Sequence, residues 1–219
     1  HRESVQSLCN MAGFGMEMVN QIKANGLCSI PVNRDSGVEE LINKAVRKLI
    51  ALIPDLAERT EHIILAHSLP VLSENDTSVL KDSIDGLHME EIPRIELSGM
   101  PCTILHMAIQ MGRALLNDQR DDKGVLIIGE DQALSPEDRI FFGSTMGDAA
   151  VAGFLNGATD KNIILSSITE TEVIACDGEL SQTEEIKKFR EMNPLNIRHA
   201  VQTALAEAAL DISEIKYIV

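Results

Sequence analysis

Cys102 is the residue whose surroundings best suit nucleophilic chemistry in this chain. It follows an extended segment with alternating apolar positions, Ile92–Leu97, and a strongly helical apolar pattern begins at Ile104. The first backbone N–H groups of a helix have no partner inside the helix, and the helix dipole makes that end positive. Both effects stabilise a thiolate and favour the binding of an oxyanion. Position alone leaves a second interpretation open, a buried and inert cysteine that packs as a small hydrophobe.

His106 is the nearest titratable side chain to this cysteine along the chain. It lies four residues after Cys102, so a helix would place both side chains on one face. The pair could form a thiol and its base, or a Cys-x₃-His metal pair, but we favour a histidine satisfied within the core. His62 and His67 flank a short apolar segment, and we interpret both as structural.

The cysteines are not arranged to bind a metal. None of the four forms a CxxC pair, and their spacing does not match that of metal ligands. They are Cys9, Cys28, Cys102 and Cys176. We therefore predict reduced thiols, no metal and a cytoplasmic location.

The composition excludes several classes of function. The 219 residues include 34 Asp and Glu against 19 Lys and Arg, which gives a formal charge of −15. Such an acidic chain repels phosphate backbones and anionic lipid surfaces, so we predict neither nucleic-acid nor membrane binding. Aromatic residues make up only 3% of the chain, which argues against a base-stacking surface. The hydrophobic content of 44% is enough for a large core.

Helical and strand-like patterns alternate along the chain, which predicts an α/β protein. The predicted helices are residues 3–24, 36–53, 77–84, 104–115 and 193–210. The predicted strands are 63–66, 92–97, 125–129, 141–142, 147–155, 163–168, 173–176 and one that starts at 217. Val125–Gly129 is apolar throughout, as expected of a strand buried on both faces. Asn193 is the predicted cap of the last helix, with Pro194 in its first turn.

One helix–loop–strand unit occurs twice. The helix around Ala45–Val46 is echoed around Ala200–Val201, and the strand at Ile63–Ile64 is echoed at Ile218–Val219. We therefore expect an N-terminal half, residues 1–157, which carries the cysteine, and the start of a second half, residues 158–219, with a soft boundary within 156–160. Because the chain opens without Met and stops inside the second strand, we expect it to be truncated at both ends.

Several motifs, in this order, resemble the β-ketoacyl-acyl-carrier-protein synthase III group of the thiolase superfamily. They are Ser98–Cys102 before an apolar helix, Gly124–Asp131, Asp138–Arg139, Phe142–Gly143 and Met146–Val151. The resemblance implies a thiolase-like α/β fold, with αβαβα layers and internal duplication. The chain departs from the family pattern at Met100–Pro101, where the family has small residues, and by the extra Ser144 and Thr145.

The resemblance also implies a reaction and its substrates. Cys102 would take an acyl group from a thioester of coenzyme A or acyl carrier protein, and a second substrate would then accept it, as in fatty acid or polyketide biosynthesis. No permanently bound cofactor is expected. Arg139 would contact the coenzyme A nucleotide, or else form a surface ion pair. The family's histidine and asparagine, which assist the second step, would follow Val219.

Two other interpretations remain open. The chain could be a non-catalytic thiolase-fold subunit that pairs with a related one, since the family's coenzyme A residues are not recognisable here. It could also be an unrelated α/β binding protein. The resemblance further implies a homodimer or heterodimer, with the loop Leu69–Asp76 near the partner's site.

Overall fold

The chain forms two compact units, His1–Ala158 and Thr159–Val219. This division lies within the predicted boundary segment, but whether the units are halves of a duplicated fold stays a prediction. The computed structural model describes residues 1–34, 36–68, 84, 86–99, 103–116, 122–133, 135–141, 144–157, 162–169 and 183–217.

A four-stranded mixed sheet forms the centre of the first unit, in the order β4-β3-β5-β8. Its strands are β3 (Thr60–His67), β4 (Arg94–Leu97), β5 (Gly124–Asp131) and β8 (Ala149–Asn156). The strands β4, β3 and β5 are parallel, and β8 runs antiparallel to β5. In this register Ile64 pairs with Ile95 on one side and with Ile127 on the other.

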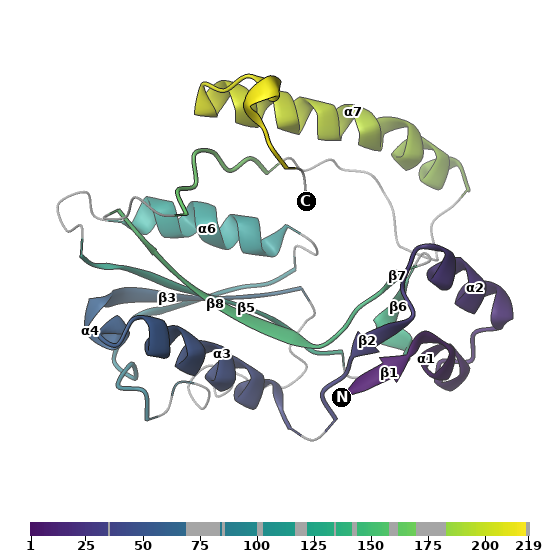
Figure 1. Cartoon of the computed structure of the whole chain (residues 1–219), viewed down its shortest axis with the longest axis horizontal. Helices are drawn as coiled ribbons and strands as arrows, with labels where there is room; N and C mark the ends of the chain where they lie inside the picture. The colour runs from purple at the N-terminus through teal and green to yellow at the C-terminus, as the bar shows by residue number, and fades with distance from the viewer. Residues whose placement is uncertain are drawn as a thin grey trace. The chain divides into compact units, whose positions relative to one another are not determined.

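Helices cover both faces of this sheet (Figure 1). The helix α3 (Val38–Leu52) packs on one face and α6 (Ile104–Leu115) on the other. Because side chains alternate along a strand, each inner strand contributes to two cores. Ile63, Leu65, Leu126 and Ile128 lie in the α3 core, whereas Ile64, Ala66, Val125 and Ile127 lie in the α6 core. The predicted burial of β5 on both faces is confirmed.

The N-terminal segment differs from the single helix predicted over residues 3–24. It consists of β1 (Arg2–Ser4), α1 (Val5–Met11), α2 (Met16–Ala24) and β2 (Ser29–Pro31), and β1 pairs with β2. Gly13, which has a φ of 76°, separates the two helices because this left-handed conformation cannot continue an α-helix. Their apolar faces form a separate cluster around Val5, Leu8, Val19 and Ile22.

The remaining elements of the first unit are short. They are α4 (Leu56–Arg59), the 3₁₀ helix η1 (Glu137–Arg139), β6 (Ile140–Phe141) and β7 (Ser144–Thr145). The last two form a two-stranded antiparallel sheet.

The second unit contains a long helix, α7 (Thr183–Ala208), and a 3₁₀ turn, η3 (Ile212–Glu214). The predicted start at Asn193 is wrong, because α7 begins ten residues earlier and contains Pro194 in its interior. Glu184 and Glu185 lie in the first turn, where the helix dipole favours negative charge.

Another prediction for this unit is also wrong. Residues 163–168 have no strand conformation, because they pair with no strand among the residues that the structure describes. The predicted strands at 173–176 and 218–219 lie outside the described residues, as does nearly all of the predicted helix 77–84. Within the described residues, no helix combines the length and the apolar character needed to cross a bilayer.

We expect Leu126→Ala to lower the free energy of unfolding by about 2–5 kcal/mol, because it empties a fully buried position at the centre of the α3 core. Urea denaturation measures the change. Leu52→Ala is the matched control, since the same atoms are removed from a side chain that is 79% exposed, and it should change stability by less than about 0.5 kcal/mol. Equal losses in the two variants would contradict the described core.

Candidate functional site

Three parallel strands of the first unit end side by side, and we call the row of their carboxyl ends the sheet edge. In the chain, α6 begins just after one of these strands. β4 ends at Leu97, and the first helical residue of α6 is Ile104. Cys102 lies between them, but it falls outside the described residues together with Met100 and Pro101. The site is therefore defined by the described residues around this connection and at the ends of β3 and β5.

The described residues nearest to Cys102 are Gly99 on one side and Thr103 on the other. Gly99 has a φ of 79°, a left-handed conformation that glycine adopts without strain. Thr103 occupies the N-cap position of α6, but its side chain makes no capping hydrogen bond. The Met107 N–H donates to the Thr103 carbonyl oxygen at 3.0 Å, which closes the first turn. The N–H groups before Met107 therefore have no partner within the helix, as the anion-binding argument for this end requires.

The first turn of α6 packs against a glycine of β5. A Cβ atom at Gly129 would meet Leu105 Cδ1 at 3.3 Å and Val151 Cγ1 at 3.1 Å. Both contacts are tighter than ordinary van der Waals contact, so a larger residue would push Leu105 outward. Gly129 thus allows the start of α6 to lie close to the sheet.

A side-chain clamp joins the ends of β3 and β5. Asp131 accepts two hydrogen bonds from Ser68, one from the backbone N–H to Oδ1 at 2.8 Å and one from the hydroxyl to Oδ2 at 2.9 Å. By strand alternation both residues belong to the face that α6 covers. The clamp therefore orders the sheet edge on the same face as the helix that follows Cys102.

The α3 face of the same edge carries a cluster of titratable groups. His67, at the end of β3, is 2% exposed, and its Nε2 lies 2.8 Å from Glu96 Oε1 on β4. Glu130 of β5 is directly opposite His67 in the strand register and is 8% exposed.

Burial raises the pKa of Glu130 to about 7, because a desolvated carboxylate is costly. His67 opposes this shift through its positive charge when protonated, whereas Asp131, Glu96 and Glu39 add to it by repulsion. Glu39 comes from the first turn of α3. Among the carboxyl groups that the structure describes, Glu130 is thus the one whose protonation changes near neutral pH.

Arg139, predicted to contact coenzyme A, is buried in a structural ion pair. Its guanidinium donates to Asp148 Oδ1 at 2.6 Å and Oδ2 at 3.0 Å, and to the Ala133 carbonyl oxygen at 2.7 Å. Asp148 also accepts from the N–H groups of Asn33 and Ala133. The alternative of a surface ion pair is wrong, since Arg139 is 6% exposed. Contact with coenzyme A stays an untested prediction, although these bonds already engage both terminal nitrogens.

His106 is not a core histidine, contrary to the favoured interpretation. It lies on the exposed side of α6, because Ile104, Ala108 and Gly112 are the residues that face the sheet. No group of three or more metal-binding side chains occurs among the described residues. Whether His106 acts on Cys102 stays a prediction.

The two described cysteines are both free thiols and differ in exposure. Cys28 is exposed, whereas Cys9 is buried, and burial raises the pKa of the Cys9 thiol. Neither lies at the sheet edge. They provide an exposed and a buried thiol in the same chain, against which the reactivity of Cys102 can be compared.

Sequence analysis did not predict the polar residues at the sheet edge. His67 was interpreted as structural, and Ser68, Glu96, Glu130 and Asp131 were not assigned a role. A usable signal exists, because each of them lies at or beside the carboxyl end of a parallel strand, where α/β proteins place functional groups. Only the strand order brings them together, and that order is not visible in the sequence.

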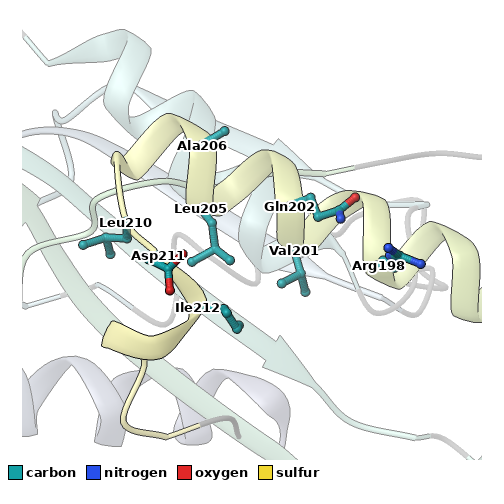
Figure 2. A pocket seen from close by; sticks show the side chains of 8 residues that line it. All are labelled: Arg198, Val201, Gln202, Leu205, Ala206, Leu210, Asp211 and Ile212. Carbon is teal, nitrogen blue, oxygen red and sulfur yellow. The ribbon is translucent and has the colours of Figure 1, made fainter.

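The second unit has an apolar groove beside the C-terminal half of α7. Figure 2 shows Val201 and Leu205 of α7 extending toward the turn that carries Leu210 and Ile212. Three polar residues, Arg198, Gln202 and Asp211, also line it. The groove consists of residues of the second unit, whereas the candidate site is defined by residues of the first.

Comparison with solved structures identifies the fold. The chain is similar to 3-oxoacyl-[acyl-carrier-protein] synthase III from Aquifex aeolicus VF5, with a TM-score of 0.69 and 17% identity over 98% of this chain and 70% of that one. ChlB3, described as an acyltransferase, has a TM-score of 0.67 and 16% identity over 98% and 69%. The β-ketoacyl-[acyl-carrier-protein] synthase III of Thermus thermophilus has a TM-score of 0.64 and 17% identity over 98% and 71%. No family model and no curated protein matches the sequence.

The chain therefore has a thiolase-like α/β fold. Its fold is similar to that of two ketoacyl synthase III structures and of an acyltransferase, which confirms the thiolase-like fold predicted from the order of the sequence motifs. At 16–17% identity these structures establish the architecture of this chain and not its activity.

We expect Glu130→Gln to remove a loss of stability that the unmodified protein suffers as the pH rises. The pKa of about 7 in the folded protein lies above the ordinary value of 4.5. The contribution of this carboxyl group to the free energy of unfolding is therefore fully present below pH 4.5 and is lost as the pH rises through 7. Each pKa unit corresponds to about 1.4 kcal/mol, so the unmodified protein should lose on the order of 2–3 kcal/mol relative to the variant. Urea denaturation at pH 5 and pH 8 measures this, with the exposed Glu58→Gln as control. Parallel pH curves for Glu130→Gln and the unmodified protein would contradict the assignment.

Arg139→Ala should destabilise the first unit by about 3–5 kcal/mol, because it leaves the buried Asp148 carboxylate without its cation. Thermal denaturation compared with Arg113→Ala, which removes an exposed arginine, measures the difference. If Arg139→Ala instead kept full stability and weakened only the binding of coenzyme A, the structural role would be refuted and the contact with the nucleotide supported.

Proposed function

We propose that this chain is an acyl-transferring enzyme of the thiolase fold in which Cys102 carries the acyl group. The observation that carries the proposal is the position of Cys102 in the chain, between the end of β4 and the start of α6. The N-terminus of α6 supports it, because Thr103 makes no side-chain capping hydrogen bond and the first N–H groups of a helix have no partner inside the helix. The ketoacyl synthase III type of fold adds the expected reaction class.

The proposed first step is transfer of an acyl group to the enzyme. The Cys102 thiolate attacks the carbonyl carbon of an acyl thioester, and the carbonyl oxygen becomes an oxyanion that backbone N–H groups stabilise. The intermediate collapses as the bond to the donor sulfur breaks. The products are an acyl-cysteine thioester and the donor thiol, which takes up the proton that Cys102 gave up.

In the second step a nucleophilic substrate takes the acyl group from Cys102. The acceptor attacks the thioester carbonyl, and the cysteine sulfur leaves as a thiolate. A carbanion produced by decarboxylation of a malonyl thioester would make this a condensation, whereas an alcohol or amine would make it a simple transfer. A histidine and an asparagine would assist this step, as the resemblance in sequence implies.

We propose coenzyme A or acyl carrier protein as the carrier of the donor group. The names of the Aquifex and Thermus proteins specify an acyl carrier protein for those enzymes, and their similarity to this chain supports the same class of carrier. The carrier itself is a substrate, so no resident cofactor is required.

We expect iodoacetamide to alkylate Cys102 at least about tenfold faster than Cys28 at pH 7, because a helix N-terminus stabilises the thiolate and raises its fraction. Peptide mapping by mass spectrometry measures the rate at each cysteine of the unmodified chain. Preincubation with acetyl-coenzyme A should protect Cys102 and add the mass of one acetyl group to its peptide. Cys102→Ser should abolish that addition.

The two described cysteines serve as internal controls in the same sample. The exposed Cys28 should be accessible to the reagent, and the buried Cys9 should react more slowly than Cys28. Alkylation of Cys102 no faster than that of Cys28, without acylation, would rule out the proposal and favour the non-catalytic partner subunit.

We further propose that the protein is a dimer, as the resemblance implies. The loop expected near the partner's site, Leu69–Asp76, lies outside the described residues. Light scattering of the purified chain determines whether it is a homodimer, and a monomeric mass would count against this part of the proposal unless a related subunit is added.

A further inference from the structure

The second unit lacks a buried core among the residues that the structure describes. None of its described residues is buried, whereas the three apolar core clusters consist entirely of residues of the first unit. Fifteen large apolar side chains are exposed in the described parts of the chain, and ten of them belong to the second unit. A concentration of exposed apolar side chains marks a surface that another molecule covers.

The helix α7 repeats the residues with which α3 faces its sheet. Ile42 of α3 corresponds to Ile197 of α7 at an offset of 155 positions, which is the offset of the two helix–loop–strand units. Val46 corresponds to Val201 at the same offset. In α3 both side chains are 0% exposed and lie in the core that this helix forms with β3 and β5. In α7 the corresponding side chains are 56% and 44% exposed, so identical residues are buried against a sheet in one unit and exposed in the other.

These two residues belong to a continuous apolar stripe on α7. Its members recur at helical spacing, and we call them the α7 stripe: Ile197, Ala200, Val201, Ala204, Leu205 and Ala208. A second groove, which shares Val201 and Leu205 with the groove of Figure 2, lies along this stripe. Its other walls come from residues 163–166 and 210–217. No charged residue lines this second groove, so its occupant must present apolar side chains.

A face of a β-sheet is the surface that fits this stripe. In the first unit, the equivalent residues of α3 pack on alternate apolar residues of β3 and β5, so that helix and sheet bury each other's apolar side. The described residues of the second unit contain no strand that could take this place. The described sheet of a second copy cannot take it either, because α3 and α6 already cover its two faces.

The similar solved structures contain polypeptide that could supply such a sheet. The match with the Aquifex synthase covers 98% of this chain and thus includes the second unit, but it covers only 70% of that structure. The rest of the Aquifex structure has no counterpart among these 219 residues. A similar share of ChlB3 and of the Thermus synthase lies outside the match.

We propose that the α7 stripe is the docking surface for a β-sheet on a further polypeptide, which corresponds to the part of the Aquifex synthase structure outside the match. The observation that carries this inference is the contrast between Val46, fully buried in α3, and Val201, exposed in α7. The sheet presents alternate apolar side chains to the stripe, as β3 and β5 do to α3. The inference does not involve Cys102, so its outcome is independent of the proposed acyl transfer.

The first experiment measures whether the stripe is exposed in this chain by itself. Val201→Asp should change the hydrogen exchange of peptides that cover residues 195–208 by less than about twofold, since a charge at an exposed position costs little. Val46→Asp, its counterpart in α3, should accelerate the exchange of residues 38–52 at least about a hundredfold, because it buries an unpaired carboxylate. Equal effects of the two substitutions would mean that the stripe is already covered and would overturn the inference.

The same measurement over a range of chain concentrations tests the second copy as occupant. Exchange of residues 195–208 should not depend on the concentration of the chain. Slower exchange at higher concentration, removed by Val201→Asp, would assign the stripe to self-association and overturn the inference.

The second experiment adds the sheet. The probe is the segment of the Aquifex synthase outside the match, produced as a separate polypeptide. Its addition should slow the exchange of residues 195–208 at least about tenfold, because docking suppresses local opening of the helix. Val201→Asp should abolish this protection. Ala206→Asp is the matched control, since it adds the same charge to an exposed position that points away from Val201 and Leu205 in Figure 2, and it should leave the protection intact.

A fused chain provides the same test if the separate segment does not fold. Joining the segment after Val219 should protect residues 195–208 to a similar extent, and again Val201→Asp, but not Ala206→Asp, should remove the protection. If the segment protects these residues neither when added nor when fused, or protects the Val201→Asp chain equally, the docking role of the α7 stripe is overturned.

Discussion

The burial of β3 and β5 on both faces is the constraint on which the rest of the first unit depends. Each strand places alternate side chains into two different cores, so neither strand can slip by one residue without exchanging the contents of both. The two helices are held in place by the same alternation, with α3 on one core and α6 on the other. Because α6 packs on the odd-numbered residues of β5, the position of its first turn follows directly from the strand register.

This register also determines which polar groups meet at the carboxyl edge. Where the apolar residues of β3 and β5 end, their continuation places His67 and Glu130 on the α3 face and Ser68 and Asp131 on the α6 face. The two faces differ in chemistry as a result. The α3 face carries the buried His67 and Glu130 together with the partly exposed Glu96, and the α6 face carries the hydrogen-bonded pair Ser68 and Asp131.

A second set of interactions holds the periphery of the unit. The Asp148 carboxylate, just before β8, accepts hydrogen bonds from Arg139, from Asn33 after β2 and from Ala133 after β5. This buried carboxylate therefore joins Asn33 to residues 133–148, which lie far from it in the sequence. Its full set of donors explains how a charge can be buried there, since the cost of desolvation is offset by charge-assisted hydrogen bonds. Arg139 belongs to this arrangement by geometry, even though its sequence motif suggested a ligand.

The amino-acid sequence by itself determined those features that depend on neighbouring residues. Strict apolar runs and helical spacing predicted β3, β5, α3 and α6, and the motif order around Cys102 predicted the type of fold. These predictions succeeded because the spacing of apolar residues along a helix or strand shows which of its faces is buried. The helical parts of the internal echo are present as α3 and α7, although the second strand of the echo lies outside the described residues.

Only the tertiary structure decided which charges are buried and which segments pair. His67, Glu96 and Glu130 come from three strands whose order cannot be deduced from their spacing along the chain. Residues 163–168 have strand-like composition but no described strand to pair with, and Pro194 is accommodated inside a helix that it was expected to begin. The physical reason is common to all three. Strand pairing, charge burial and tolerance of a proline depend on contacts between residues far apart in the chain, whereas sequence patterns report only what neighbouring residues prefer.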